Sequence, residues 1–412
     1  MQPLCQSIIS EERLNLMEPF YPLHVYVCHN CYLVQLDEYV SPTDIFTEYA
    51  YFSSYSDSWL DHSKKYVDMI TEKLNLTENN LVIEIASNDG YLLQYFNEKK
   101  VPILGVEPAA NVAKVAIEKG VPTLVKFFNL KTAHELVEEG KQADLVIGNN
   151  VLAQVPTLND FVEGINVVLK EKGVVTLEFP HLLKLMNYNQ FDTIYHEHFS
   201  YFSFYTIERI FNAHDLKVFD VEQLSTHGGS IRVYGAHMDD ESKKETTRVW
   251  DLKRAETGLL DIKAYSSFSE KVKRTKRKCL ETLIKIKEQG KSIAGYGAPG
   301  KGNTFLNYTG IGTDFLDFVV DRNPYKQYKY LPGTRIPVFP PSKIMETKPD
   351  YLVVLPWNLK NEIMAQNSFI QGWGGKFITL IPEPQVIDPV SAIMEVQASI
   401  EELTHTLESK NI

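Results

Sequence analysis

The sequence has no excess of positive charge, no long apolar run and few cysteines, and each absence excludes a class of protein. Its 42 lysines and arginines are outnumbered by 53 acidic residues, giving a net charge of −11. Such a surface repels a phosphate backbone, so no nucleic-acid partner is expected. No apolar run is long enough to span a membrane, and the first residues lack the basic and apolar regions of a signal peptide. Four cysteines in 412 residues do not make a disulfide framework. We expect a soluble, cytoplasmic protein without a membrane partner, either a monomer or a small homo-oligomer.

What is present is an ordinary globular composition, with 44% hydrophobic and 23% charged residues. Short apolar runs typical of buried parallel strands alternate with helical segments from residue 58 onward. In the first half these runs are 81–85, 103–106, 145–147 and 174–177, and in the second half they are 292–294, 318–320, 351–355 and 377–380. A long helix is predicted over 265–289, between the two sets. The alternation predicts an α/β fold with two Rossmann-like units.

The stretch from Glu84 to Gly90 follows the strand predicted over 81–85 and has the small, turn-forming residues of a nucleotide-binding loop. The next predicted strand ends in Glu107, where a carboxylate can accept both hydroxyls of a ribose. A turn that contains Glu84 and Asp89 suits the positive sulfonium of S-adenosylmethionine better than it suits a pyrophosphate. The alternative is that these two carboxylates only cap a turn and a helix.

A cofactor site for S-adenosyl-L-methionine is therefore predicted at this turn. Polar residues after the strand at 145–147 are expected to line its methionine end, because ligands of open α/β sheets bind at the carboxyl ends of strands. The predicted cofactor-binding residues are Glu84, Ala86, Ser87, Asn88, Asp89, Gly90, Glu107, Pro108, Asn149, Asn150 and Leu152.

A second cluster of reactive side chains lies in the run QFDTIYHEHFSYFS over 190–203. His198 can take and give a proton near neutral pH, Tyr195 can donate a hydrogen bond to a developing oxyanion, and Glu197 can orient the histidine. If the run were a strand, His196 and His198 would share one face and could bind a metal, but no third ligand with suitable spacing lies nearby. The remaining alternative is a structural cluster of aromatic residues and histidines.

The second half carries the loop GYGAPG over 295–300, which fits the G-x-G-x-x-G pattern, and Asp321 ends the next predicted strand. This combination is typical of NAD-binding proteins. Pro299, however, removes an amide donor from the loop, and Lys301 adds a positive charge at the start of the following helix. The diphosphate of a nucleotide sugar fits the loop as well as NAD does.

Taken together, these segments resemble the nucleotide-sugar C-methyltransferases of branched deoxysugar pathways. The resemblance runs from about residue 22 to 384. The matching stretches are FTEYAYFSSYSDSW (46–59), EIASNDGYLLQYF (84–96), GVEPAANVA (105–113), EFPH (178–181), QFDTIYHEHFSYFS (190–203), THGGS (226–230), GYGAPGKGNT (295–304), DRNP (321–324) and LPWN (355–358).

The resemblance implies methylation, by way of an enolate, of C3 in a nucleoside-diphosphate 4-keto-deoxyhexose. His198 would be the base, Tyr195 and Glu197 would support it, and Tyr49 would close over the sugar. The substrate-binding residues implied in this way are His181, Gln154, Gly297, Ala298, Gly300, Lys301, Asn303 and Arg322. Two alternatives are an NAD-dependent nucleotide-sugar oxidoreductase and a non-catalytic homologue that binds nucleotide sugars.

The resemblance also implies the division of the chain. We expect an N-terminal domain of degenerate zinc-binding type over 1–57, a class I methyltransferase domain over 58–262 and a Rossmann-like nucleotide-sugar-binding domain over 263–387. An amphipathic helical tail is expected over 388–412, docked on its own domain or, as the alternative, contacting another subunit.

The sequence departs from the family pattern at two places. The family's zinc site has two C-x-x-C pairs, whereas here Cys28 and Cys31 form a single pair and Cys5 stands alone. Half a site is expected to bind zinc weakly. The second departure is Gln154, where the family pattern usually has histidine. Glutamine hydrogen-bonds but does not titrate, so this position bears on the proton chemistry and on the choice of sugar.

Overall fold

The computed structural model describes residues 1–47, 49 and 51–389. By its internal contacts the chain divides into two compact units, which are described separately below. The larger unit comprises residues 24–184 and 196–265, and the smaller unit comprises residues 1–23, 185–195 and 266–389. All but the first two residues of the tail expected over 388–412 lie outside the described residues.

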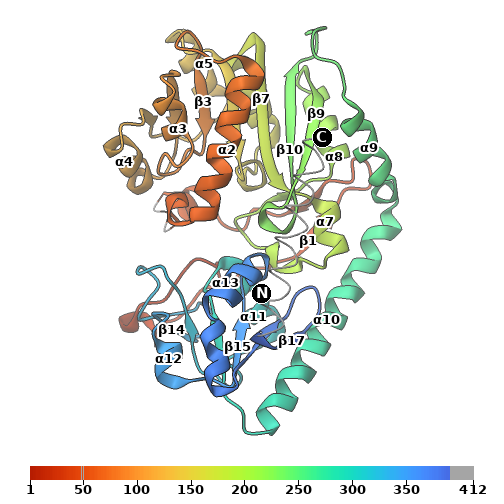
Figure 1. Cartoon of the computed structure of the whole chain (residues 1–412). Helices are drawn as coiled ribbons and strands as arrows, with labels where there is room; N and C mark the ends of the chain where they lie inside the picture. Colours follow the sequence, from red (N-terminus) through yellow and green to blue (C-terminus); the bar gives the residue numbers. More distant parts are fainter. Residues whose placement is uncertain (48, 50, 390–412) are drawn as a thin grey trace, which may run out of the picture. The chain divides into compact units, whose positions relative to one another are not determined.

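A seven-stranded sheet forms the centre of the larger unit (Figure 1). In spatial order its strands are β5 (Thr123–Leu124), β4 (Ile103–Val106), β3 (Val82–Ile85), β6 (Ala143–Asn149), β7 (Leu169–Pro180), β10 (Ser230–His237) and β9 (Leu216–Leu224). The first five strands are parallel, and β10 is antiparallel to both of its neighbours. The parallel part therefore directs the carboxyl ends of its strands to one edge, where ligands of open α/β sheets bind.

Helices cover both faces of this sheet. The helices are α1 (Pro42–Phe46), α2 (Asp57–Leu74), α3 (Leu93–Glu98), α4 (Ala110–Glu118), α5 (Leu130–Glu138), α6 (Leu158–Val168), α8 (Phe204–Asn212) and α9 (Thr247–Ala255). One core joins α5, α6, α8 and α9 to the sheet, and a second core joins α2, α3 and α4 to its opposite face. This layering is a doubly wound α/β fold, so the fold class predicted from the sequence is confirmed.

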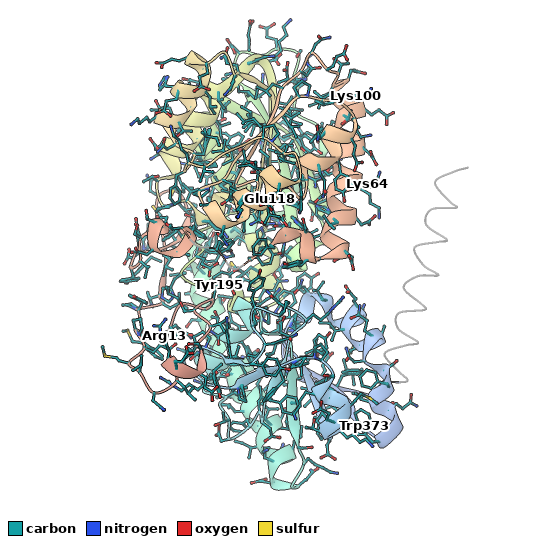
Figure 2. The ribbon with its side chains drawn as sticks, turned by 90° about the vertical axis from the view of Figure 1, so that its left-hand side faces the viewer. Arg13, Lys64, Lys100, Glu118, Tyr195 and Trp373 are labelled. Carbon is teal, nitrogen blue, oxygen red and sulfur yellow. The ribbon has the colours of Figure 1, made fainter. Side chains whose placement is uncertain are left out.

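Helix α2 has a clear start, a clear end and one buried face. The side chain of Ser56 caps its first turn by accepting a hydrogen bond from the Trp59 amide, and Asn75 ends it in the left-handed conformation. Tyr66, Val67 and Ile70 pack on the sheet, and Figure 1 shows α2 lying along β3 and β7. On the other side of the helix, the exposed Lys64 points into solvent (Figure 2).

A small antiparallel sheet belongs to the same unit. It contains β1 (Val25–Val27), β2 (Val34–Leu36) and β8 (Ser200–Tyr201). Strand β8 pairs with β2 through Tyr201 and Ser200. The reactive segment predicted over 190–203 is therefore attached at its end to the hairpin that carries Cys28 and Cys31.

The smaller unit contains a second seven-stranded sheet. In spatial order its strands are β13 (Lys329–Tyr330), β14 (Pro337–Phe339), β12 (Val319–Val320), β11 (Ile293–Tyr296), β15 (Tyr351–Val354), β16 (Lys376–Thr379) and β17 (Gln385–Ile387). The central five are parallel and the two edge strands are antiparallel. Its helices include α11 (Gly300–Thr309), α12 (Lys343–Thr347) and α13 (Lys360–Gln366). This is the second Rossmann-like arrangement that the sequence predicts.

Two helices, α7 (Leu182–Asn187) and α10 (Ile262–Glu288), begin in one unit and continue into the other. Residues 1–23 pack with 266–389, whereas residues 24–57 belong to the larger unit. The domain boundaries expected at 57, 262 and 387 stay predictions. Among the described residues, no helix is both long and apolar enough to cross a membrane.

Candidate active site

The turn after β3 has the backbone geometry of a ligand-binding loop. Ala86, Asn88 and Gly90 all have positive φ, at 57°, 49° and 77°. At Gly90 an added Cβ would lie 3.0 Å from a methyl group of Val121, so the turn is both tight and closely packed. Such a turn brings main-chain groups close to the end of β3, as the sequence predicts.

Glu107, at the end of β4, fixes this turn in place. One of its oxygens accepts a hydrogen bond from the amide of Asn88 at 2.9 Å, and the other accepts from the amide of Ala109 at 2.8 Å, across Pro108. Burial raises the pKa of Glu107, against the lowering effect of these two amides. Each carboxylate oxygen still has a second lone pair for a ribose hydroxyl.

Several buried polar atoms around the turn make no hydrogen bond of ordinary geometry. They are both carboxylate oxygens of Glu84, Oγ of Ser87, Oδ1 of Asp89 and Oδ1 of Asn149, with the hydroxyl of Tyr91 interacting with the side chains of Glu84 and Asn149. Burial raises the pKa of Glu84 well above its usual range, and the carboxylates of Glu107 and Asp89 add to this effect. Buried polar atoms without partners are rare, and acceptors grouped in this way suit a ligand that brings donors and positive charge. The ammonium, ribose and sulfonium of S-adenosylmethionine fit this set.

An aromatic segment, residues 49 and 51–55, is tied to the turn. The amide of Ser53 donates to the side chain of Asn88 at 2.9 Å, and the amide of Ser54 donates to Asp89 at 3.3 Å. Tyr49 exchanges two hydrogen bonds with the side chain of Asn111 on α4. These bonds hold the aromatic segment against the predicted cofactor site.

The same segment reaches the predicted reactive cluster. The hydroxyl of Tyr49 donates to Oε2 of Glu197 at 3.3 Å. Glu197 and His198 are buried in a turn just before β8, and the ring of His198 packs edge-on against Tyr201. This brings Tyr49, Glu197 and His198 together in the larger unit.

Tyr195, which Figure 2 labels, is grouped with residues 185–195 in the smaller unit. Residues 196 and 197 form a turn and residue 198 is irregular, so the strand on which His196 and His198 would share a face is absent there. The metal-binding alternative for His196 and His198 is therefore not supported, because strand β8 begins only at Ser200.

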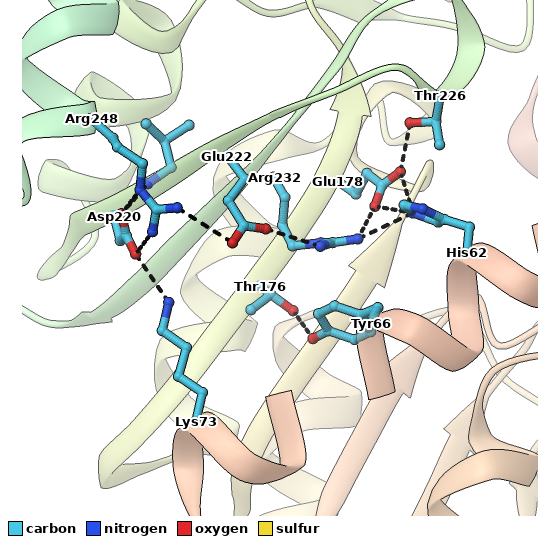
Figure 3. A network of polar contacts seen from close by, with 11 residues as sticks. His62, Tyr66, Lys73, Thr176, Glu178, Asp220, Glu222, Thr226, Arg232 and Arg248 are labelled. Carbon is cyan, nitrogen blue, oxygen red and sulfur yellow. Dashed lines mark hydrogen bonds and ion pairs between the residues drawn. The ribbon is translucent and has the colours of Figure 1, made fainter. Parts of the chain in front are cut away.

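Sequence reasoning missed a network of buried charges centred on Glu178 of β7 (Figure 3). The fully buried Glu178 accepts hydrogen bonds from Arg232 at 2.6 Å, from Thr226 at 2.9 Å and from Nε2 of His62 at 2.9 Å. Burial alone would raise the pKa of Glu178, but the His62 hydrogen bond and the Arg232 charge bring it to about 2. The partners come from α2, β10 and the turn after β9, so no local spacing in the sequence could reveal them.

In the smaller unit, the glycine loop leads from β11 into α11. Gly297 has φ of 87°, and an added Cβ would lie 2.5 Å from Pro356, so this position requires glycine. Asp321 accepts hydrogen bonds from the amides of Ala298 at 2.7 Å and Asn323 at 2.8 Å. The acid at the second strand end thus holds the loop backbone, as Glu107 does in the larger unit.

Lys301 lies at the start of α11 beside a buried carboxylate. Its ammonium hydrogen-bonds to Asn358 and lies 4.4 Å from the ring centre of Trp357. Trp357 donates its indole N–H to Asp192 at 2.7 Å. Burial raises the pKa of Asp192 to about 7, and burial lowers the pKa of Lys301 to about 8. The ammonium of Lys301, which was predicted to bring positive charge to this loop, thus contacts other residues of the smaller unit.

The remaining predicted substrate residues have mixed surroundings. His181 is buried and its Nε2 contacts Glu256, which leaves Nδ1 for any further bond. Gln154 is partly buried in the short helix η3 (Leu152–Gln154) after β6. Asn303 donates to the carbonyl of Cys5, next to Gly300. Arg322 follows the loop acid Asp321 directly.

Cys28 and Cys31 lie in the turn between β1 and β2. The amides of Cys31 and Asn30 lower the pKa of Cys28, and burial raises the pKa of Cys31. Cys5 belongs to the smaller unit, where its sulfur packs at Gly300. Throughout the described ranges, no group of three or more histidine, cysteine or acidic side chains is arranged to hold a metal. Two thiols do not fit a structural zinc site, which needs four ligands.

Comparison with known proteins agrees with this architecture. Three family models match in order along the chain: a "Putative zinc binding domain" over 1–46, a "Methyltransferase domain" over 60–221 and a "C-methyltransferase C-terminal domain" over 225–382. The strand order and the loop after β3, together with these matches, define a class I S-adenosylmethionine-dependent methyltransferase.

The particular family follows from a curated relative. The chain is 35% identical over 393 residues to the C-methyltransferase NovU of Streptomyces niveus, a match that covers 95% of this chain and 93% of the relative. The chain belongs to this family of C-methyltransferases, and the resemblance expected from the sequence is confirmed.

Solved methyltransferases also match part of the chain. The magnesium protoporphyrin IX methyltransferase of Synechocystis PCC 6803 is 15% identical, with a TM-score of 0.33, and the match covers 44% of this chain and 82% of that one. A S-adenosylmethionine-dependent methyltransferase of Clostridium acetobutylicum ATCC 824 is 11% identical, with a TM-score of 0.35, and the match covers 43% and 92% of the two chains.

Proposed function

We propose that this protein methylates C3 of a nucleoside-diphosphate 4-keto-deoxyhexose in branched deoxysugar biosynthesis. The observation that carries the proposal is the hydrogen bond from Tyr49 to Glu197. Tyr49 is also bonded to Asn111, shortly after Glu107 in the cofactor site, so this one residue links the predicted cofactor site to the segment that carries His198.

The proposed reaction requires a base close to the acidic C–H bond next to the ketone. A ketone acidifies the neighbouring C–H, and in this proposal His198 removes that proton to leave an enolate. Glu197 orients the base, Tyr195 donates a hydrogen bond to the enolate oxygen, and Tyr49 closes over the sugar. S-adenosylmethionine, when bound, supplies an electrophilic methyl group. Holding both reactants in one geometry accounts for much of the rate.

The smaller unit would bind the nucleotide part of the acceptor. Gly297, Ala298 and Gly300 allow close approach to the loop backbone, and Lys301 and Arg322 bring positive charge for a diphosphate. Asn303, His181 and Gln154 complete the proposed substrate contacts. Because Gln154 does not titrate, the proton chemistry rests on His198 in this proposal.

A panel of 4-keto nucleotide sugars incubated with the protein and S-adenosylmethionine tests this function by mass spectrometry. We expect one acceptor to gain one methyl group. His198→Asn should abolish this turnover and leave S-adenosylmethionine binding, measured by calorimetry, unchanged. Normal turnover by this variant would refute the base assignment, and no methylation of any acceptor by the wild type would refute the function.

The glycine loop with Asp321 favours a second candidate, an NAD-dependent nucleotide-sugar oxidoreductase. Both oxygens of Asp321 already accept hydrogen bonds from the amides of Ala298 and Asn323. Calorimetric titration with NADH separates the candidates, because only the oxidoreductase should bind it at this loop.

A further inference from the structure

Among the described residues, His62 makes its polar contacts through one nitrogen of its ring, Nε2. Its Nε2 lies 3.1 Å and 2.9 Å from the two oxygens of Glu178. A carboxylate whose pKa is about 2 is ionised and only accepts hydrogen bonds. Nε2 therefore carries a proton, and in the neutral tautomer with this proton Nδ1 keeps its lone pair.

Arg232 contacts both residues of this pair. Its guanidinium donates to Glu178 at 2.6 Å and lies 3.1 Å from Nε2 of His62. Because the guanidinium and Nε2–H are both donors, this second contact is not a hydrogen bond, and Glu178 accepts from both groups. Among the described residues, the polar contacts of His62 are made by Nε2, and 20% of its side chain is exposed. Nδ1 thus keeps an acceptor lone pair of fixed orientation on a partly exposed ring.

The position of His62 matches the place where a methyl acceptor binds in such a sheet. Glu178 pairs in register with Asn149 of β6, and its carbonyl accepts from the amide of Asn150 at 2.7 Å. The ring of Trp59 stacks on the ring of His62, with 5.0 Å between the ring centres, and it also contacts the ring of His227. His227 in turn lies 3.1 Å from the side-chain amide of Asn150. His62 therefore lies among residues at the carboxyl ends of β6 and β7.

We propose that Glu178 and His62 form a recognition dyad, in which Nδ1 of His62 accepts a hydrogen bond from a hydroxyl group of the methyl acceptor. Glu178 acts through His62 and is a positioning residue, whereas His62 contacts the acceptor. The dyad selects acceptors that carry this hydroxyl and orients them. This inference rests on the proposed function, and it adds a specificity residue that lies outside the motif containing His198.

The test compares two acceptors in the wild type and in three variants. The acceptors are a nucleoside-diphosphate 4-keto-6-deoxyhexose with a hydroxyl next to the ketone and the corresponding deoxy compound. We expect His62→Phe to lower kcat/KM about tenfold for the hydroxylated acceptor and to leave the deoxy acceptor nearly unchanged, since one hydrogen bond contributes on this order. His62→Gln, whose amide can serve both partners, should retain part of the preference. Lys73→Met, at the far end of the network in Figure 3, should retain all of it.

A merely structural role predicts a different result. His62→Phe would then lower kcat/KM for both acceptors by the same factor, and that outcome overturns the dyad. Nitrogen-15 NMR of histidine-labelled wild type gives a second measurement that needs no variant. We expect the neutral ring of His62 to carry its proton on Nε2, and a neutral ring protonated on Nδ1 overturns the inference. If the wild type methylates neither acceptor, the proposed function fails. If it methylates both equally, only the dyad fails.

Discussion

Glu84 illustrates how a single residue can be unfavourable for the fold and favourable for the site. It is fully buried on β3, and apart from an interaction with Tyr91 neither of its oxygens has a hydrogen-bond partner. Its raised pKa means that ionisation is more difficult in the folded chain than in the unfolded one. Ionised Glu84 therefore destabilises the ligand-free protein as the pH rises above 4.5, the usual pKa of a glutamate side chain. A cationic ligand would remove that cost.

We predict that Glu84→Gln stabilises the ligand-free protein at pH 7 and weakens S-adenosylmethionine binding. The neutral amide has no ionisation cost, so the gain in the free energy of unfolding should shrink as the pH falls toward the usual carboxylate range. Urea unfolding at both pH values and calorimetry with S-adenosylmethionine provide the measurements. The exposed Glu118→Gln is the matched control and should change neither quantity. A destabilised Glu84→Gln with normal cofactor affinity would contradict the prediction.

Which site residues the sequence can predict depends on how far apart the partners lie. Asn88 and Glu107 belong to one strand–turn–helix–strand unit, so their spacing already indicates a shared site. His62, Glu178 and Arg232 come from three elements far apart in sequence. Their meeting depends on the order of strands in the sheet, which the sequence pattern alone does not determine.

At the scale of elements, the turn between β9 and β10 stores backbone strain. His227, Gly228 and Gly229 have consecutive positive φ values of 53°, 88° and 120°. The short helix η5 (Thr226–Gly228) lies within this turn. It places the side chain of Thr226 in hydrogen-bond contact with Glu178 and that of His227 in contact with Asn150. The left-handed conformation costs free energy at His227, whereas glycine at the next two positions avoids that cost, and such strain is retained where the resulting side-chain direction is needed.

Gly229→Ala should lower the free energy of unfolding by about 1–3 kcal/mol, because a side chain at this φ is strained and its Cβ would also meet Lys184. Gly258→Ala is the control, since that glycine has open space around it and should change stability by less than about 0.5 kcal/mol. Equal losses in the two variants, measured by urea unfolding, would show that the strain is not specific to the turn.

Which strands could be predicted from the sequence depends on whether the apolar pattern is interrupted by charged residues. Runs such as 81–85 and 145–147 are apolar because both sheet faces are covered, so β3 and β6 were predicted correctly. No strand was predicted at β9 or β10. Asp220 and Glu222 interrupt the apolar pattern of β9, and the structure compensates them with Lys73, Arg248 and Arg232. Such compensation is visible only once the sheet has formed.

At the scale of the whole molecule, each unit carries one nucleotide-type loop. In each unit a carboxylate at the end of the next strand, Glu107 or Asp321, accepts a hydrogen bond from an amide of the loop. If the proposed function is right, the two loops bind different ligands. Lys301→Met should then weaken binding of a nucleoside diphosphate about tenfold and leave S-adenosylmethionine affinity unchanged, because a charge-assisted contact is lost in one unit only.

Calorimetry with uridine and thymidine diphosphate measures this effect, and Glu107→Gln provides the reciprocal variant. We expect it to weaken S-adenosylmethionine binding and to leave nucleoside-diphosphate binding unchanged. An unchanged nucleoside-diphosphate affinity in Lys301→Met would remove Lys301 from the proposed acceptor site.

The composition of the smaller unit has a consequence for synthesis on the ribosome. Residues 1–23 pack with residues 266–389, for example through the antiparallel bridge between Ile9 and Tyr330 and the bond from the Gly333 amide to Glu18. Residues 1–23 are therefore translated well before their partners, whereas the larger unit has all its segments once residue 265 is made. We infer that the nascent chain completes its methyltransferase fold first and that residues 1–23 reach their packed state only after residues 266–389 have been made.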